Sequence, residues 1–171
     1  MAGNSSHQLR LRVAHFARRV PWLIRALQSV YQRTRPHYTL GVTGVIFNPH
    51  GQVLLVEHVL HPRHPWGLPG GWVDAREKPQ DSLARELREE VQLIVRVDAL
   101  LHMETLIEMH HIDFAYLCLA DTHAVGKLSP ELLGYGWFDL DALPDLDPFN
   151  RTAIANALKL RHDVQAMPHA G

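Results

Sequence analysis

The sequence contains a single cysteine and no long apolar run. One cysteine, Cys118, excludes an intramolecular disulfide and any metal site built from cysteines alone. It lies in the apolar segment from Phe114 to Ala120, which predicts a buried strand residue rather than a reactive thiol. No apolar segment approaches the roughly 20 residues that a membrane-spanning helix needs, and the first residues lack the pattern of a secretory signal. We therefore expect a cytoplasmic protein.

Acidic residues are missing from the first part of the chain. No Asp or Glu precedes Glu57, and the same stretch holds seven arginines. Apolar side chains recur at helical spacing over residues 9–20 and 22–31, so we predict a basic helical extension over residues 1–36. Such a segment suits an anionic membrane surface or nucleic acid, and it has some features of a transit peptide. Packing on the rest of the chain, or on a second subunit in a homodimer, is the interpretation we favour.

Residues 37–165 alternate strand and helix signals and form the predicted main domain, followed by a flexible tail over residues 166–171. Strand-like composition predicts a hairpin of residues 38–47 and 52–59 around the turn at residues 48–51. Further strands are expected at residues 72–73, 93–97, 100–107, 112–119 and 135–138, and helices at residues 79–91 and 150–162. Strands that pair mainly as hairpins, with single helices between them, favour an α/β fold with a mixed sheet.

The predicted helix over residues 79–91 carries an unusual set of acids. Pro79 suits the first turn of a helix. At about 100° per residue the apolar side chains share one face, which predicts that they pack on the core: Leu83, Ala84, Leu87 and Val91. Three glutamates share the adjacent face at spacings of three and four: Glu86, Glu89 and Glu90. These carboxylates are therefore expected to project together beside the core.

Three carboxylates at the margin of a core repel one another unless a cation neutralises them. Oxygen ligands on a rigid helix suit Mg²⁺ or Mn²⁺, hard cations that keep water ligands and bind phosphate. A solvated helix face with salt bridges from Arg85 and Arg88 accounts for the same residues without a function. The preceding segment adds context, because Gly70 and Gly71 permit close backbone approach to a ligand and Glu77 lies between them and the helix.

Together these residues resemble the Nudix box. That box is a glycine, five residues, a glutamate, seven residues, and then Arg-Glu-apolar-any-Glu-Glu-any-Gly-apolar. Here Gly71 is followed by Glu77 and then by the segment from Arg85 to Leu93, with every charged position met over 23 positions. Gln92 stands where the box has its last glycine. If this position adopts the left-handed conformation, Gln costs about 1 kcal/mol or more relative to glycine.

The resemblance covers about residues 38–162, because Trp66 to Gly71 and Trp137 to Pro144 also resemble the family's lead-in and closing strand. It implies an α/β/α sandwich with a mixed β-sheet, to which the N-terminal helical extension is added. It also implies a magnesium-dependent hydrolase, with manganese as a substitute metal, that cuts a diphosphate linkage in a nucleoside diphosphate derivative or related nucleotide.

The resemblance implies roles for the residues of the box. Glu86, Glu89 and Glu90 would hold the metal, with the carbonyl of Gly70 or Gly71 as a further ligand, and the metal would polarise phosphorus for attack by water. Arg85 would orient these carboxylates through a salt bridge to Glu77. Arg63 is a candidate phosphate contact or a solvated residue. The general base stays open between Glu86 and several downstream acids: Glu104, Glu108, Asp113 and Glu131.

Other interpretations compete with a hydrolase. A nucleotide-sensing regulatory or binding module of the same fold would usually lose box carboxylates, whereas this chain keeps all of them. Diphosphate isomerisation needs cysteine chemistry that a buried Cys118 does not offer. A zinc site would use histidine clusters that chance readily produces among 13 histidines: His58, His61 and His64, and His110 with His111. Trp66 and Trp72 are predicted packing residues, with stacking on a base as the alternative.

Overall fold

The computed structural model describes residues 21–60 and 63–166, and it divides the chain into two compact units, residues 1–37 and 38–171. In the first, helix α2 (Pro21–Arg33) leaves Trp22, Val30 and Tyr31 exposed. The helix predicted ahead of Pro21 and residues 167–171 of the predicted tail lie outside the described residues. None of the described helices is long and apolar enough to cross a membrane.

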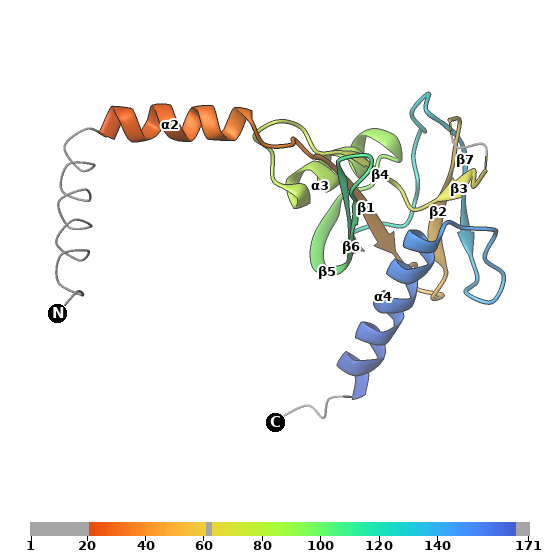
Figure 1. The fold of residues 1–171 in the computed structure, drawn as a ribbon. Coiled ribbons are helices and arrows are strands. Elements are labelled where there is room, and N and C mark those ends of the chain that lie inside the picture. Colours follow the sequence, from red (N-terminus) through yellow and green to blue (C-terminus); the bar gives the residue numbers. More distant parts are fainter. Residues whose placement is uncertain (1–20, 61–62, 167–171) are drawn as a thin grey trace. The chain divides into compact units, whose positions relative to one another are not determined.

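A four-stranded mixed sheet forms the centre of the second unit (Figure 1). Its strands lie in the order β4 (Gly70–Trp72), β1 (Thr39–Ile46), β6 (His111–Ala120) and β5 (Val95–Leu106). The β1–β6 pair is parallel and the other two pairs are antiparallel, so the predicted mixed sheet is confirmed. Strand structure is confirmed over most of residues 93–97 and 100–107, but the predicted break between two strands is wrong. β5 is one continuous strand whose register with β6 shifts between residues 97 and 102.

A second, antiparallel sheet contains β3 (Trp66–Gly67), β2 (Val53–His58) and β7 (Leu132–Phe138) in that order. The predicted hairpin is therefore wrong: β1 and β2 belong to different sheets and share only the bridge between Phe47 and Val53. The physical reason is burial on both faces. A hairpin strand with one solvent-facing side would alternate between buried and exposed residues. Residues 53–56 are instead all buried, so β2 is an interior strand of its own sheet. The turn between β1 and β2 is nevertheless tight, with Gly51 at φ 83°.

Two helices cover opposite faces of the four-stranded sheet (Figure 1). On α3 (Pro79–Glu90), Leu83 and Leu87 pack with Val42 and Ile46 of β1, on the face that the helical periodicity predicted. On α4 (Pro148–Ala166), the buried side chains pack with the alternate residues of β1 and β6: Ala153, Ile154 and Ala157. The sheet thus holds α3 by one face and leaves the carboxylate face of that helix at its margin.

The cysteine is buried as the sequence predicted. Cys118 lies on β6 and packs in the same cluster as α3. Burial raises the pKa of its thiol to about 12, so the thiol stays protonated at neutral pH. This position supplies no nucleophile or metal ligand.

Candidate functional site

The glycine pair on β4 brings the backbone against α3. A β-carbon on Gly70, whose φ is 155°, would lie 2.0 Å from the Val42 carbonyl oxygen, so only glycine fits there. A β-carbon on Gly71 would lie 2.5 Å from the carboxyl carbon of Glu86. The two glycines therefore allow the β4 backbone to reach the acidic face of the helix.

Glu90 is the buried acid of the site. Its side chain is only 6% exposed, and Oε2 accepts a hydrogen bond from the Gly70 N–H at 3.1 Å. Burial raises the pKa of Glu90 to about 7; the hydrogen bond from Gly70 lowers it, and the charges of Glu86 and Glu131 raise it again. Glu90 thus accepts one hydrogen bond and has no basic partner among the described residues. Its ionised form is therefore poorly solvated.

Arg85 gathers the other acids of the segment. Its guanidinium contacts Glu77 at 3.0 Å, Glu86 at 2.9 Å and Glu89 at 3.3 Å. It also approaches the Trp72 carbonyl oxygen at 3.4 Å, which ties the loop after β4 to the helix. The salt bridge between Arg85 and Glu77 that the sequence predicted is present. Arg85 holds the Glu86 carboxylate in the position that faces Gly71.

The pKa shifts of these acids differ in direction. The hydrogen bonds from Arg85 hold the pKa of Glu77 below its usual value. Burial raises the pKa of Glu86 even though Arg85 opposes that shift. The same contacts, led by the hydrogen bonds to Glu77, raise the pKa of Arg85, which stays charged at all relevant pH values. Glu86 and Glu90 are therefore the two acids whose ionised forms are least stabilised by the protein.

The position where the box has glycine is left-handed, which is the case in which the sequence analysis assigned a cost to glutamine. Gln92 has φ 57°, and the N–H of the next residue, Leu93, donates to the Leu87 carbonyl oxygen at 3.2 Å. The Gln92 side chain is also used, because its Oε1 accepts the Lys127 N–H at 3.1 Å. A β-carbon on Gly126 would lie 2.1 Å from that same Oε1, so a glycine on the facing loop makes room for the glutamine.

The loop facing Gln92 satisfies the end of α3. The Gly126 N–H donates to the Val91 carbonyl oxygen and the Ser129 N–H donates to that of Glu90, both at 3.0 Å. Hydrogen bonds from the facing loop thus satisfy the end of α3 although Gln92 stands where the box has glycine, and they hold the backbone of Glu90.

The donor set suits a hard divalent cation. Within the described residues, no three His, Cys, Asp or Glu side chains already converge as a metal cluster, because Arg85 holds Glu86 and Glu89 while Glu90 faces Gly70. The groups available are carboxylate and carbonyl oxygens, the ligands that Mg²⁺ and Mn²⁺ prefer. The charge of Glu86 raises the pKa of Glu90, and a cation beside these acids would oppose that shift.

The remaining predicted residues lie in varied settings. Arg63 is exposed. Among the candidate bases, Glu104, Glu108 and Glu131 are exposed, and Asp113 pairs with His111 at 2.9 Å. Glu131 is the only one of these four acids whose charge acts on Glu90. The general base thus stays open.

The two tryptophans near the glycines differ. Trp66 packs edge-on against Phe138 with ring centres 5.0 Å apart, as a packing residue would. Trp72 is 61% exposed, which the predicted packing role does not explain, and its ring centre lies 4.8 Å from that of His111. Sequence reasoning missed this contact because the two residues lie on strands that are distant in sequence.

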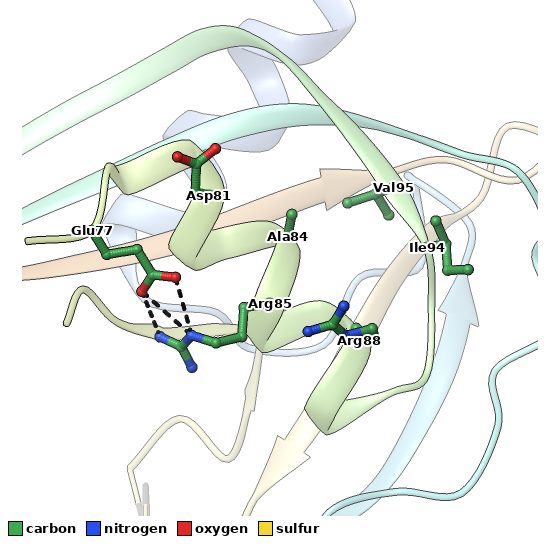
Figure 2. Close-up of a pocket in the computed structure, with 7 residues that line it drawn as sticks. All are labelled: Glu77, Asp81, Ala84, Arg85, Arg88, Ile94 and Val95. Atoms are coloured by element: carbon green, nitrogen blue, oxygen red, sulfur yellow. Dashed lines mark hydrogen bonds and ion pairs between the residues drawn. The ribbon is translucent and has the colours of Figure 1, made fainter.

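A hollow of about 420 Å³ lies on another side of α3 (Figure 2). Asp81, Ala84 and Arg88 line it from the helix, together with Ile94 just before β5 and Val95 at its start. Figure 2 also shows the ion pair of Glu77 and Arg85 at its rim. Glu77 and Arg85 also line this hollow, whereas the three glutamates proposed as metal ligands do not: Glu86, Glu89 and Glu90.

Known proteins are similar to this chain in sequence and in fold. An RNA pyrophosphohydrolase of Vibrio atlanticus is 43% identical over 56 residues, 33% of this chain and 31% of that relative, so the match spans about a third of its length. An ADP-ribose pyrophosphatase structure from Streptococcus suis is 27% identical with a TM-score of 0.59, covering 79% of this chain and 96% of that one. A MutT NUDIX hydrolase structure from Burkholderia pseudomallei is 28% identical with a TM-score of 0.61, covering 70% and 98%.

The family model of the NUDIX domain matches residues 37–157, which include both sheets, α3 and the first half of α4. The matched region contains the glycine pair, the arginine that holds the acids, and the buried glutamate at the end of the helix. The chain therefore belongs to the Nudix family.

Proposed function

We propose that this protein is a Mg²⁺-dependent hydrolase that cuts a diphosphate linkage in a nucleotide derivative. The observation that carries the proposal is the placement of Glu86 and Glu90. Both acids are shielded from solvent, both have raised pKa values, and both face the backbone of the glycine pair. Two such acids beside a close backbone approach form a site for a divalent cation and the phosphate oxygens it binds.

Each residue has a role in the proposed site. Glu86, Glu89 and Glu90 would hold the cation, with the Gly71 carbonyl as a further ligand; Mn²⁺ would substitute for Mg²⁺. When bound, the cation supplies charge neutralisation and polarises phosphorus toward water. Arg85 positions Glu86 and Glu89 through its ion pairs, and Glu77 holds Arg85. Gly70 and Gly71 let the diphosphate approach the backbone, and Arg63 would contact its outer phosphate.

The relatives support the substrate class. One is named for RNA pyrophosphohydrolysis and another for ADP-ribose pyrophosphatase activity, and both names specify a phosphoanhydride bond next to a nucleoside. We therefore propose a nucleoside diphosphate derivative or related nucleotide as the substrate, hydrolysed by attack of water on phosphorus. The catalytic unit is proposed to span residues 37–165.

The test is turnover of a substrate panel with Mg²⁺ and with chelator. The panel contains nucleoside triphosphates, ADP-ribose, other nucleoside diphosphate conjugates and 5′-triphosphorylated RNA. We expect Mg²⁺-dependent release of phosphate products from at least one class. Glu89→Gln and Glu90→Gln should each lower turnover more than about 100-fold, beyond the 10–100-fold typical of residues that only support metal ligands.

Asp81→Asn is the matched control, since Asp81 is an exposed acid on the same helix that lines the separate hollow. It should keep wild-type turnover. Turnover that survives both glutamate substitutions would refute the metal assignment. Nucleotide binding without any turnover across the panel would instead identify a nucleotide-sensing module.

A further inference from the structure

An exposed aromatic residue follows the glycine pair directly. Trp72 ends β4, the edge strand of the four-stranded sheet, and is 61% exposed. Its carbonyl oxygen accepts a hydrogen bond from the Ser82 hydroxyl at 3.0 Å, so its backbone is held to α3. Its sequence neighbour Gly71 faces Glu86. Because side chains alternate along a strand, the exposed Trp72 ring lies on the opposite face of the sheet from the position that faces Glu86. β4 is the edge strand, so a ligand can reach both faces across its open edge.

One side of the Trp72 ring contacts His111. Trp72 pairs with Gly41 on β1, and the absence of a side chain there lets the indole approach His111 on the next strand, β6. A β-carbon at Gly41 would lie 2.2 Å from Asp113 Oδ1 and 2.9 Å from His111 Nε2. Gly41 is therefore required for the cluster that Trp72, His111 and Asp113 form across three strands.

The histidine of this cluster is held from both ring nitrogens. His111 Nε2 lies 2.9 Å from Asp113 Oδ1, and Nδ1 lies 2.8 Å from the Thr39 hydroxyl oxygen. His111 is only 8% exposed, so its ring is held in place where it meets the indole at an interplanar angle of 57°. An indole supported from one side and exposed on the other is a preorganised stacking surface.

Carboxylates border the stacking surface. In the described chain Asp113 makes its one polar side-chain contact through Oδ1, which leaves Oδ2 available as an acceptor. Glu104 on β5 is the direct register partner of Asp113, so the two side chains point to the same face of the sheet, and Glu104 is exposed. These two carboxylates accept N–H donors and repel phosphate and carbonyl oxygens, and Asp113 is the nearer of the two to the strand of Trp72.

We propose that Trp72 stacks on the nucleobase of the substrate and that Asp113 accepts a hydrogen bond from an exocyclic amino group of that base. This inference rests on the proposed function for the identity of the ligand, and it adds the base class. Adenine, cytosine and guanine present an amino group, whereas uracil presents carbonyl oxygens that face the carboxylates unfavourably. The site therefore selects amino-bearing nucleotides over uridine nucleotides while the diphosphate lies toward Gly71 and Glu86.

The experiment measures equilibrium binding of AMP, CMP, GMP and UMP in chelator, where no turnover contributes. We expect the wild type to bind the first three more tightly than UMP. Trp72→Leu should weaken AMP binding at least about fivefold, the lower range for loss of one base–aromatic stack. Trp72→Phe should retain part of the affinity. Asp113→Asn should narrow the preference for AMP over UMP, because an amide can also donate to a uracil carbonyl.

Trp22→Leu is the matched control, since Trp22 of the other unit is also an exposed tryptophan, at 69% against 61% for Trp72. It should leave AMP binding unchanged. Unchanged AMP affinity in Trp72→Leu, or equal wild-type affinity for AMP and UMP, would overturn the inference even if the protein hydrolyses diphosphates. Loss of AMP binding in Trp72→Leu in a protein without turnover would uphold the base site and refute the proposed hydrolase.

Discussion

Glu77 and Glu90 belong to one sequence motif, yet the protein treats them in opposite ways. Glu77 lies on the loop before α3, and hydrogen bonds from Arg85 lower its pKa. Glu90 lies at the end of the helix, and burial raises its pKa to about 7. The first acid is stabilised as an anion by the chain itself and serves to position Arg85. The second is left without a basic partner in the described structure, which is the state expected of a group that awaits a cation.

After substitution of the proposed metal ligands themselves, the largest expected effect comes from changing Arg85, the residue that positions them. Arg85→Lys keeps the charge but removes the planar guanidinium that contacts Glu77, Glu86 and Glu89 together. We expect kcat to fall about 10–100-fold, the range for residues that orient metal ligands. Higher Mg²⁺ should restore part of the loss, as measured by steady-state kinetics over a metal titration. Arg88→Lys, at an exposed neighbour, is the control and should behave as wild type.

A second prediction concerns stability and pH in chelator. The pKa of Glu90 is raised in the folded state, so the folded protein binds more protons than the unfolded chain between about pH 4.5 and pH 7. The stabilising contribution is complete below the unfolded pKa and is lost as the pH rises through about 7. Glu90→Gln removes this loss while its amide oxygen can still accept the Gly70 N–H.

The free energy of unfolding of Glu90→Gln, relative to that of the wild type, should therefore rise by on the order of 2 kcal/mol as the pH increases from 4.5 to 8. Denaturant unfolding at a series of pH values measures this difference. Equal pH dependence in the two proteins would mean that the Glu90 charge is well solvated or paired. Adding Mg²⁺ at pH 8 should stabilise the wild type and leave Glu90→Gln almost unaffected.

The smallest effect is expected at the helix end beside Glu90. Gln92→Ala keeps the left-handed strain of a side-chain-bearing residue but loses the hydrogen bond to the Lys127 N–H, so it should destabilise the fold by about 1 kcal/mol. Gln92→Gly loses the same bond but relieves the strain, and its stability should stay within about 1 kcal/mol of the wild type. Thermal unfolding compares the two. A stability order with the alanine variant above the glycine variant would contradict this account of Gln92.

Local patterns in the sequence predicted much of this molecule. The helical period placed Leu83 and Leu87 in the core, and the spacing of the box located the glycine pair, Glu77 and the three glutamates of α3. Local patterns failed where pairing is long-range. The tight turn after β1 indicated a hairpin, but β2 is buried on both faces and pairs with β7, far along the chain.

The same limit applies to the site. Spacing placed Glu86, Glu89 and Glu90 together but could not show that Glu90 is buried while Glu89 is exposed, because that depends on the approach of β4. The Trp72–His111 contact depends on Gly41 of an intervening strand. Alternating polar residues at the start of β6, together with a glycine in a neighbouring strand, were the available signal for it.

The most direct test of the central claim is a Mn²⁺ titration followed by electron paramagnetic resonance, comparing the wild type with Glu90→Gln and the control Asp81→Asn. The account predicts stoichiometric binding by the wild type and by Asp81→Asn, with affinity lowered at least about tenfold in Glu90→Gln. Binding of Mn²⁺ with equal affinity by all three proteins, or by none, would contradict the assignment of Glu90 as a ligand of the catalytic cation.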